Sequence, residues 1–284
     1  MDRRGGILKY FFIAAGLIIA LIAIVRLMLP EPVDEHAGQV YINDGFDMVW
    51  ITPYENVPVN TLRVEDFQTL GGIPTYQGSD YTTRLGIDVS EHQWEVNWQE
   101  AAQVIDFAYI RLGYRGYTEG GMFLDPWYDK NIAGASAAGL DTGVYFFSQA
   151  VNVSEAIEEA EFVISHLRGY RVTLPVIFDW EKIEGGGART DGMTEQTLTD
   201  CAVAFCRTLK NAGYEAGIYF NRYLGYYGFD LSRLPDCSLW VSVPGDFPDY
   251  YYACEFWQCS FTGSVPGVSG DADLNLRFLP VTTG

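Results

Sequence analysis

The stretch Leu174-Pro175-Val176-Ile177-Phe178-Asp179-Trp180-Glu181 decides how the rest of the chain is interpreted. Its apolar first half predicts a buried strand, and alternate side chains of a strand point to one face. Asp179 and Glu181 are therefore aimed together at the carboxyl end of the strand, where α/β barrels keep their active sites. Crowding raises the pKa of at least one carboxyl, and this arrangement serves acid-catalysed cleavage of a glycosidic bond.

From Leu85 onward, short apolar runs alternate with helical stretches, which predicts βα units around a parallel sheet. The expected strands are residues 85–89, 107–112, 142–147, 174–180, 216–220, 239–243, 255–259 and 272–276. Helix starts are indicated at Asp125-Pro126, Ser154-Glu155 and Thr194-Glu195. Helical signals weaken after Tyr223, so we expect an irregular α/β barrel of the TIM type that lacks several outer helices.

Two further acids belong to the expected site. Asp88 ends the first strand and Asp273 lies in the last, so closure of the barrel brings both to the mouth that holds Asp179 and Glu181. A single acid is more often a helix cap, a turn former or a solvated charge. Four acids at strand ends favour a functional site, because a buried carboxyl needs a specific reason to be there.

Aromatic residues also gather at the strand ends. They are Tyr145, Phe147, Tyr219, Trp240 and Trp257. Their apolar rings suit the faces of sugars, and core packing is the alternative for each of them.

Composition argues against other classes of function. The chain has 18 Lys and Arg against 37 Asp and Glu, a net charge of −19, which disfavours a nucleic-acid partner. The five cysteines show no C-x-x-C spacing and there are three histidines, so we expect no metal and no cofactor. Cys201 and Cys206 fit buried free thiols better than a disulfide. The sequence contains no G-x-S-x-G elbow, the motif that would indicate a serine nucleophile.

The N-terminus predicts a membrane anchor over residues 7–29, since Tyr10 to Val25 is an uncharged run flanked by Lys9 and Arg26. A cleaved signal peptide and a buried core helix are the alternatives. Basic residues before the run place the rest outside the cytoplasm, as a single-pass protein of the cell membrane. The expected order is a cytoplasmic end (1–6), the anchor (7–29), an extracytoplasmic stalk (30–84) and the barrel (85–284).

The motifs of residues 85–284 form an ordered series that resembles glycoside hydrolase family 25, the Chalaropsis-type lysozymes. The series runs through Gly86-Ile87-Asp88-Val89-Ser90, His92-Gln93, Asp125, Asn131, Ala138-Gly139-Leu140, Gly143 to Phe147, Pro175 to Glu181, Ala212-Gly213-Tyr214, Ile218-Tyr219, Trp257-Gln258 and Asp273-Leu274-Asn275. Departures are Trp94, where the family usually has glycine, and Ser242 to Gly245 after the Trp-Val strand.

The resemblance implies hydrolysis of the β-1,4 bond between N-acetylmuramic acid and N-acetylglucosamine in peptidoglycan. Glu181 would be the general acid, and Asp179 would stabilise the substrate's N-acetyl group as it attacks the anomeric carbon. Asp88 and Asp273 would complete an acidic floor. The expected substrate-binding residues are Tyr145, Phe147, Tyr219, Trp240 and Gln258. A covalent intermediate and direct inversion remain alternatives to N-acetyl participation.

The sequence therefore predicts a membrane-tethered muramidase that remodels or locally opens the cell wall. Its expected partners are peptidoglycan glycan strands and the membrane, the latter through residues 7–29. A glycan-binding scaffold without turnover, or a hydrolase of another N-acetylated polysaccharide, is the alternative.

Overall fold

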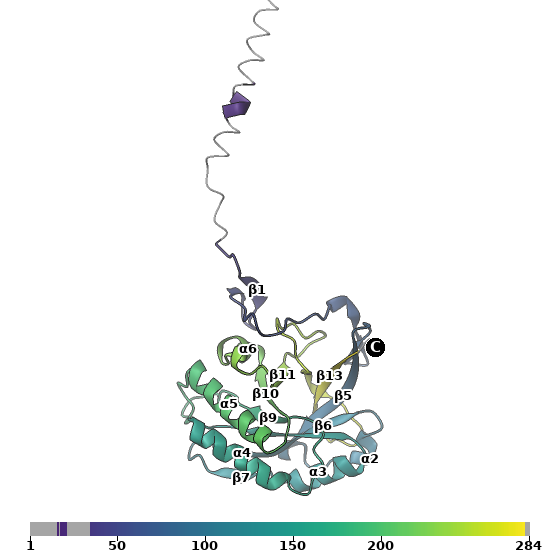
Figure 1. Cartoon of the computed structure of the whole chain (residues 1–284). Coiled ribbons are helices and arrows are strands. Elements are labelled where there is room, and N and C mark those ends of the chain that lie inside the picture. The colour runs from purple at the N-terminus through teal and green to yellow at the C-terminus, as the bar shows by residue number, and fades with distance from the viewer. Residues whose placement is uncertain (1–15, 17, 22–34, 282–284) are drawn as a thin grey trace, which may run out of the picture. The chain divides into compact units, whose positions relative to one another are not determined.

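The eight predicted strands are confirmed, and within the described part of the chain they close into a barrel (Figure 1). In chain order they are β5 (Tyr81–Val89), β6 (Phe107–Arg115), β8 (Asp141–Phe147), β9 (Val176–Asp179), β10 (Ala216–Asn221), β11 (Ser238–Ser242), β12 (Phe256–Gly263) and β13 (Ala272–Pro280). Around the barrel the order is β5-β13-β12-β11-β10-β9-β8-β6, and pairing of β5 with β6 completes the ring. A short strand, β7 (Met122–Leu124), pairs with the end of β6.

The last strand departs from the parallel pattern. β13 pairs antiparallel with both β12 and β5, whereas the other neighbours in the barrel run parallel. Because β13 runs in the opposite direction, its first residues lie at the end of the barrel where the parallel strands finish. This reversal is what brings Asp273, the second residue of β13, beside Asp88 near the end of β5.

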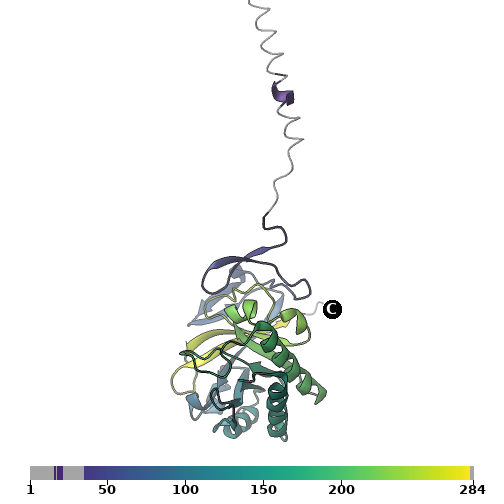
Figure 2. The same cartoon turned by 90° about the vertical axis from the view of Figure 1, so that its left-hand side faces the viewer.

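Helices cover the barrel unevenly. They are α2 (Trp98–Ala101), α3 (Tyr128–Ala137), α4 (Val153–Leu167), α5 (Glu195–Asn211) and α6 (Arg222–Tyr227), with 3₁₀ turns η1 (Val64–Asp66), η2 (Glu91–Gln93) and η3 (Leu231–Arg233). The two long helices, α4 and α5, lie side by side on the outside of the barrel in both views (Figures 1 and 2). In residues 243–271, which the structure describes in full, no helix separates β11, β12 and β13.

One of the three predicted helix starts is confirmed in detail. The Thr194 hydroxyl accepts the N–H of Thr197 and caps α5. The residue that caps α4 is Asn152, two positions before the predicted Ser154, because its side-chain oxygen reaches the N–H of Glu155. Asp125 precedes α3 but does not cap it.

The segment before the barrel packs on the strands that lack outer helices. It contains β1 (Val40–Asn43), β2 (Met48–Ile51), β3 (Phe67–Leu70) and β4 (Ile73–Tyr76). The Phe67 ring meets the rings of Trp257 and Phe278 edge-on, and the Asn60 amide donates to the carbonyls of Pro248 and Tyr250. The division between stalk and barrel at residue 84 stays a prediction.

The computed structural model describes Gly16, residues 18–21 and residues 35–281, in two units, Met1–Val40 and Tyr41–Gly284. Most of the expected anchor, residues 7–29, lies outside the described residues. Of the helices that are described, none combines the length and the apolar character needed to span a bilayer. This finding corrects the predicted localisation as a single-pass protein of the cell membrane, and the membrane partner with it.

Side chains fill the interior of the barrel beneath the mouth. Tyr109 stacks on Trp240 at 4.5 Å between ring centroids, and Phe256 meets Tyr109 edge-on. All three residues are buried. The barrel is therefore closed below, and open space for a ligand lies at the mouth. All five cysteines are free thiols, and Cys201 and Cys206 are buried as predicted.

Candidate active site

A cleft of about 790 Å³ opens at the mouth of the barrel. All the residues predicted for catalysis and substrate binding line it: Asp88, Tyr145, Phe147, Asp179, Glu181, Tyr219, Trp240, Gln258 and Asp273. The strand-end acids therefore share one space, as the predicted closure of the barrel requires.

Asp88 is the centre of a buried hydrogen-bond network. Its Oδ2 atom accepts from Gln258 Nε2 at 2.9 Å and from Asn275 Nδ2 at 2.7 Å. Each amide is fixed in turn, because Tyr219 OH donates to Gln258 Oε1 at 2.7 Å and Trp240 Nε1 donates to Asn275 Oδ1 at 2.8 Å. These contacts determine the orientation of both amides, so the Asp88 carboxyl is held rigidly.

The second acid of the floor, Asp273, lies directly opposite Asp88 on the neighbouring strand. Burial and the Asp273 carboxylate raise the pKa of Asp88 well above its usual range, although the two amide donors oppose the shift. Partial burial raises the pKa of Asp273 to about 6. The pair therefore retains a proton at a pH where isolated carboxyls are ionised.

Asp179 and Glu181 stand at the end of β9 in different surroundings. Asp179 is buried, and its Oδ1 atom has no hydrogen-bond partner among the described residues. Burial, with the carboxylates of Glu181 and Asp88, raises the pKa of Asp179 strongly. Glu181 remains exposed at the rim, where partial desolvation and the Asp273 carboxylate raise its pKa. Glu181 thus combines access to a ligand with a pKa above the usual range of a glutamate, as a general acid requires.

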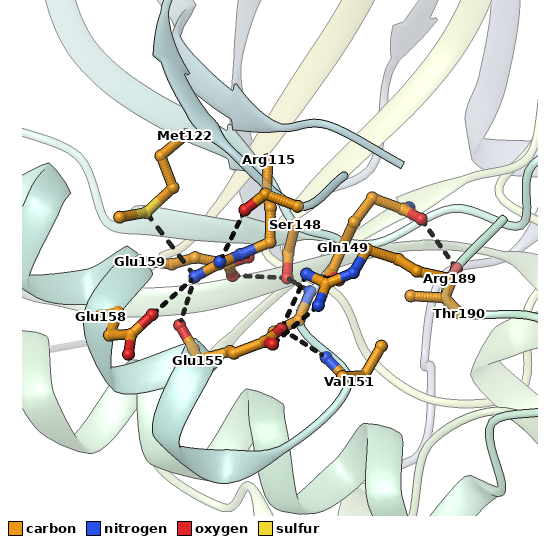
Figure 3. A network of polar contacts seen from close by, with 12 residues as sticks. Arg115, Met122, Ser148, Gln149, Val151, Glu155, Glu158, Glu159, Arg189 and Thr190 are labelled. Carbon is orange, nitrogen blue, oxygen red and sulfur yellow. Dashed lines mark hydrogen bonds and ion pairs between the residues drawn. The ribbon is translucent and has the colours of Figure 1, made fainter. Parts of the chain in front are cut away.

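The backbone around these two acids is held by residues that follow β8. Ser148 N donates to the carbonyl of Asp179 at 2.7 Å, and Gln149 Nε2 donates to the carbonyl of Glu181 at 3.3 Å. Thr190 Oγ1 in turn donates to Gln149 Oε1 at 2.7 Å, the contact at the right of Figure 3. Gln149 therefore links the backbone of Glu181 to the loop that follows β9.

A buried ion pair holds Ser148 in place through its hydroxyl (Figure 3). Arg115 Nε donates to Glu159 Oε1 at 2.7 Å, and Ser148 Oγ donates to Glu159 Oε2 at 2.6 Å. Glu159 is fully buried, and burial raises its pKa to about 7 despite the arginine and the hydroxyl. Beside this pair, the guanidinium of Arg189 donates two hydrogen bonds to the Glu155 carboxylate, at 2.7 and 2.8 Å.

Two residues that shape the site were not among the predicted site residues, although Asn275 belongs to a motif quoted above. Asn275 bonds to Asp88, and its position two residues after Asp273 on one strand was a usable signal. Arg111 lines the cleft and binds Asp125 and Glu91 at 2.8 Å each, and its charge opposes the rise in the pKa of Asp179. A lone arginine in the otherwise apolar start of β6 could have marked it.

The departure at Trp94 has a structural counterpart. Its φ of 56° lies in the region that glycine adopts readily and other residues rarely adopt. Its side chain is exposed, directly after the turn of Glu91 to Gln93 at the cleft. Trp94 thus adopts a backbone conformation that is typical of the glycine usually found at this position in the family.

The fold and site together define a class. A closed α/β barrel whose mouth holds four crowded carboxyls, one of them exposed and three of them buried or half-buried, is suited to acid–base hydrolysis.

Comparison with known proteins identifies the family. Residues 87–268 match the model of the glycosyl hydrolases family 25. Lysozyme M1 of Streptomyces globisporus is 31% identical over 233 residues, which cover 75% of this chain and 74% of that protein. The autolytic lysozyme of Clostridium acetobutylicum is 28% identical over 193 residues, 67% of this chain and 54% of that protein. The crystal structure of the lysozyme from Streptomyces coelicolor aligns with a TM-score of 0.53 at 25% identity, over 68% of this chain and 91% of that one.

The chain therefore belongs to glycosyl hydrolases family 25. It is a glycoside hydrolase of the lysozyme type, which confirms the predicted family and enzyme class.

Proposed function

We propose that the chain hydrolyses the β-1,4 bond between N-acetylmuramic acid and N-acetylglucosamine in peptidoglycan. The observation that carries the proposal is the placement of Glu181, an exposed carboxyl with a raised pKa, beside the buried Asp179 in one cleft. The similarity of the chain to two lysozymes supports peptidoglycan as the substrate and cleavage of the cell wall as the role.

Glu181 is the general acid in this proposal. It protonates the oxygen of the leaving sugar, which requires a carboxyl that keeps its proton in the bound state. Asp179 stabilises the N-acetyl group of the substrate as the carbonyl oxygen of that group attacks the anomeric carbon. The Asp179 Oδ1 atom, which has no hydrogen-bond partner among the described residues, is a suitable acceptor for an amide N–H. Water then attacks the anomeric carbon and gives a proton to the Glu181 carboxylate, and the bond from that carbon to the N-acetyl oxygen breaks, which restores both the N-acetyl group and the acid.

Asp88 and Asp273 form the floor beneath the sugar. Their shared proton limits the negative charge of the floor, and Gln258 and Asn275 keep Asp88 in place. These acids position sugar hydroxyls or water.

We assign direct sugar contact to the half-buried rings of Tyr145 and Phe147. Tyr219, Trp240 and Gln258 expose little surface, so they act mainly by holding the floor. We keep residues 85–284 as the proposed catalytic barrel, although its first strand, β5, begins at Tyr81.

Mass-spectrometric analysis of products tests the bond that is cut. Purified full-length chain is incubated with intact peptidoglycan, and the soluble fragments are reduced with borohydride to mark the new ends. The proposal expects reduced N-acetylmuramic acid at every new end. Reduced N-acetylglucosamine ends would assign a different bond, and binding without any release of fragments would favour a scaffold.

A further inference from the structure

A second cleft, of about 1100 Å³, adjoins the catalytic cleft at Glu181, which lines both. Its walls come from the loop that follows β9, from α6 and from the turn of the β1–β2 hairpin. We call it the hairpin groove, and the residues that matter here are Phe46, Trp180, Glu181, Tyr223 and Tyr227. Phe46 lies outside the part of the chain that matches the family, residues 87–268.

The groove presents aromatic rings to solvent. Phe46 is 78% exposed, Tyr223 45% and Tyr227 38%. The rings form a continuous row, because Phe46 meets Tyr223 edge-on at 5.4 Å and Tyr223 lies 4.8 Å from Tyr227. A contiguous patch of exposed apolar rings with polar residues at its rim is typical of a ligand-binding groove. Burial of these rings by a ligand is favourable.

The turn that carries Phe46 is built rigidly. The buried Asp44 accepts the N–H groups of Phe46 and Asp47 through Oδ1, both at 2.9 Å. Its other oxygen, Oδ2, accepts from Tyr227 OH at 3.2 Å, which ties the turn to α6. Gly45 has a φ of 105°, a conformation that glycine supplies without strain. The backbone at Phe46 is thus fixed before any ligand arrives, and the ring lies edge-on against Tyr223, which lowers the entropic cost of binding.

We propose that the hairpin groove binds N-acetylated sugar rings of the same glycan strand whose bond is cut beside Glu181. The inference rests on the proposed function, and it extends the substrate site to a segment outside the family match. A polymer cut inside the catalytic cleft has to continue beyond it in both directions, and Glu181 stands where the two clefts meet.

The charge of the groove selects the occupant. Acidic side chains line it at Glu181, Glu184, Asp191 and Glu195, against a single lysine, Lys182, among the described lining residues. Such a surface repels the carboxylates of the stem peptides and of the lactyl groups, so it favours the uncharged N-acetylglucosamine rings that alternate with N-acetylmuramic acid along the strand. Flat aromatic rings provide the apolar contact for the faces of those sugars.

Binding of peptide-free glycan strands to the full-length chain, measured by calorimetry in a Glu181→Gln background, tests the proposal without turnover. Adding Phe46→Ala or Tyr223→Ala should weaken binding about tenfold, because a buried ring contributes at least that much to affinity. Phe46→Tyr keeps a ring and should retain most of the affinity. Leu70→Ala is the control, since Leu70 is 59% exposed and belongs to neither cleft.

Equal affinity of the Phe46→Ala variant and its parent for peptide-free strands would overturn the groove proposal. A loss confined to fragments that carry stem peptides would overturn the glycan as its occupant. Failure of the proposed function is a separate result: the wild-type chain would then release no fragments from peptidoglycan, whatever the Phe46 variants bind.

Discussion

Asp88 and Asp273 stand directly opposite each other across the antiparallel pair of β5 and β13. Residues in this relation bring their side chains within contact distance, and two like charges there repel. Partial burial raises the pKa of Asp273 to about 6, and burial with the Asp273 charge raises the pKa of Asp88 further. The floor of the cleft therefore lowers the stability of the fold at neutral pH.

Asp273→Asn should stabilise the protein at high pH. The raised pKa means that the folded wild type binds the proton of Asp273 more tightly than the unfolded chain does. Proton binding therefore stabilises the wild type at low pH, and this contribution is lost as the pH rises from about 4 through about 6. The variant lacks that loss, and its free energy of unfolding at pH 8 should exceed that of the wild type by about 1 to 3 kcal/mol. Urea unfolding at pH 4 and pH 8 measures it. An advantage of the same size at both pH values would contradict the repulsion.

The same substitution should change the pH dependence of the reaction. The Asp273 carboxylate raises the pKa of Glu181, and a general acid works only while it is protonated. Asp273→Asn removes that charge, so the alkaline limb of the kcat/KM profile should move to lower pH. Rates on solubilised peptidoglycan across the pH range check this. A limb that stays in place or moves to higher pH would rule out coupling of the two groups.

Gln149 is expected to position Glu181. Gln149→Ala removes the donor to the Glu181 carbonyl and leaves the Thr190 hydroxyl without its acceptor. We expect kcat to fall about tenfold with little change in KM, because the acid is misplaced while sugar contacts stay. The free energy of unfolding should fall by about 1 to 3 kcal/mol. Thr190→Val is the matched control. It removes the hydroxyl that donates to Gln149 but leaves the hydrogen bond from Gln149 to the Glu181 carbonyl, so it should reduce kcat less. Equal kcat in the wild type and Gln149→Ala would deny this role.

The buried pair of Arg115 and Glu159 predicts an asymmetric stability effect. Arg115→Met leaves the Glu159 carboxylate unpaired in the core, which should destabilise the fold by about 3 kcal/mol at pH 8. The loss should shrink toward pH 5, where Glu159, with a pKa of about 7 in the wild type, is protonated. Adding Glu159→Met should restore much of the stability. Denaturant titrations of both variants would show it, and an equal loss at both pH values would refute it.

Much of the site followed from local patterns. The apolar run before Asp179 and Glu181 predicts a buried strand, and the period of two places both acids on one face. Asp88 and Asp273 were brought to the same mouth by the assumed closure of the barrel. The sequence did not show why Asp273 lies at this mouth. Asp273 stands near the start of β13, and the start of a strand reaches the mouth only when that strand runs antiparallel to the others, as β13 does.

Tertiary contacts decide what the sequence left open. Asn152 and Ser154 are both good cap residues, and Asn152 is the one whose backbone is extended and whose side chain accepts the N–H of Glu155. The segment of residues 41–80 shows no sustained period, since it packs through scattered anchors such as Asn60 and Phe67. The sequence pattern marks the positions of Arg111 and Asn275 but not their roles, because their partners Asp125 and Asp88 are distant in the sequence.

The most direct test of the account compares the wild type with Glu181→Gln on peptidoglycan, with binding to the insoluble substrate measured beside the release of reducing ends. Glutamine keeps the shape of the side chain and removes the transferable proton. We expect kcat to fall by at least about a hundredfold while binding is retained. A Glu181→Gln variant that releases reducing ends at a rate close to the wild type would contradict the assignment of Glu181 as the general acid.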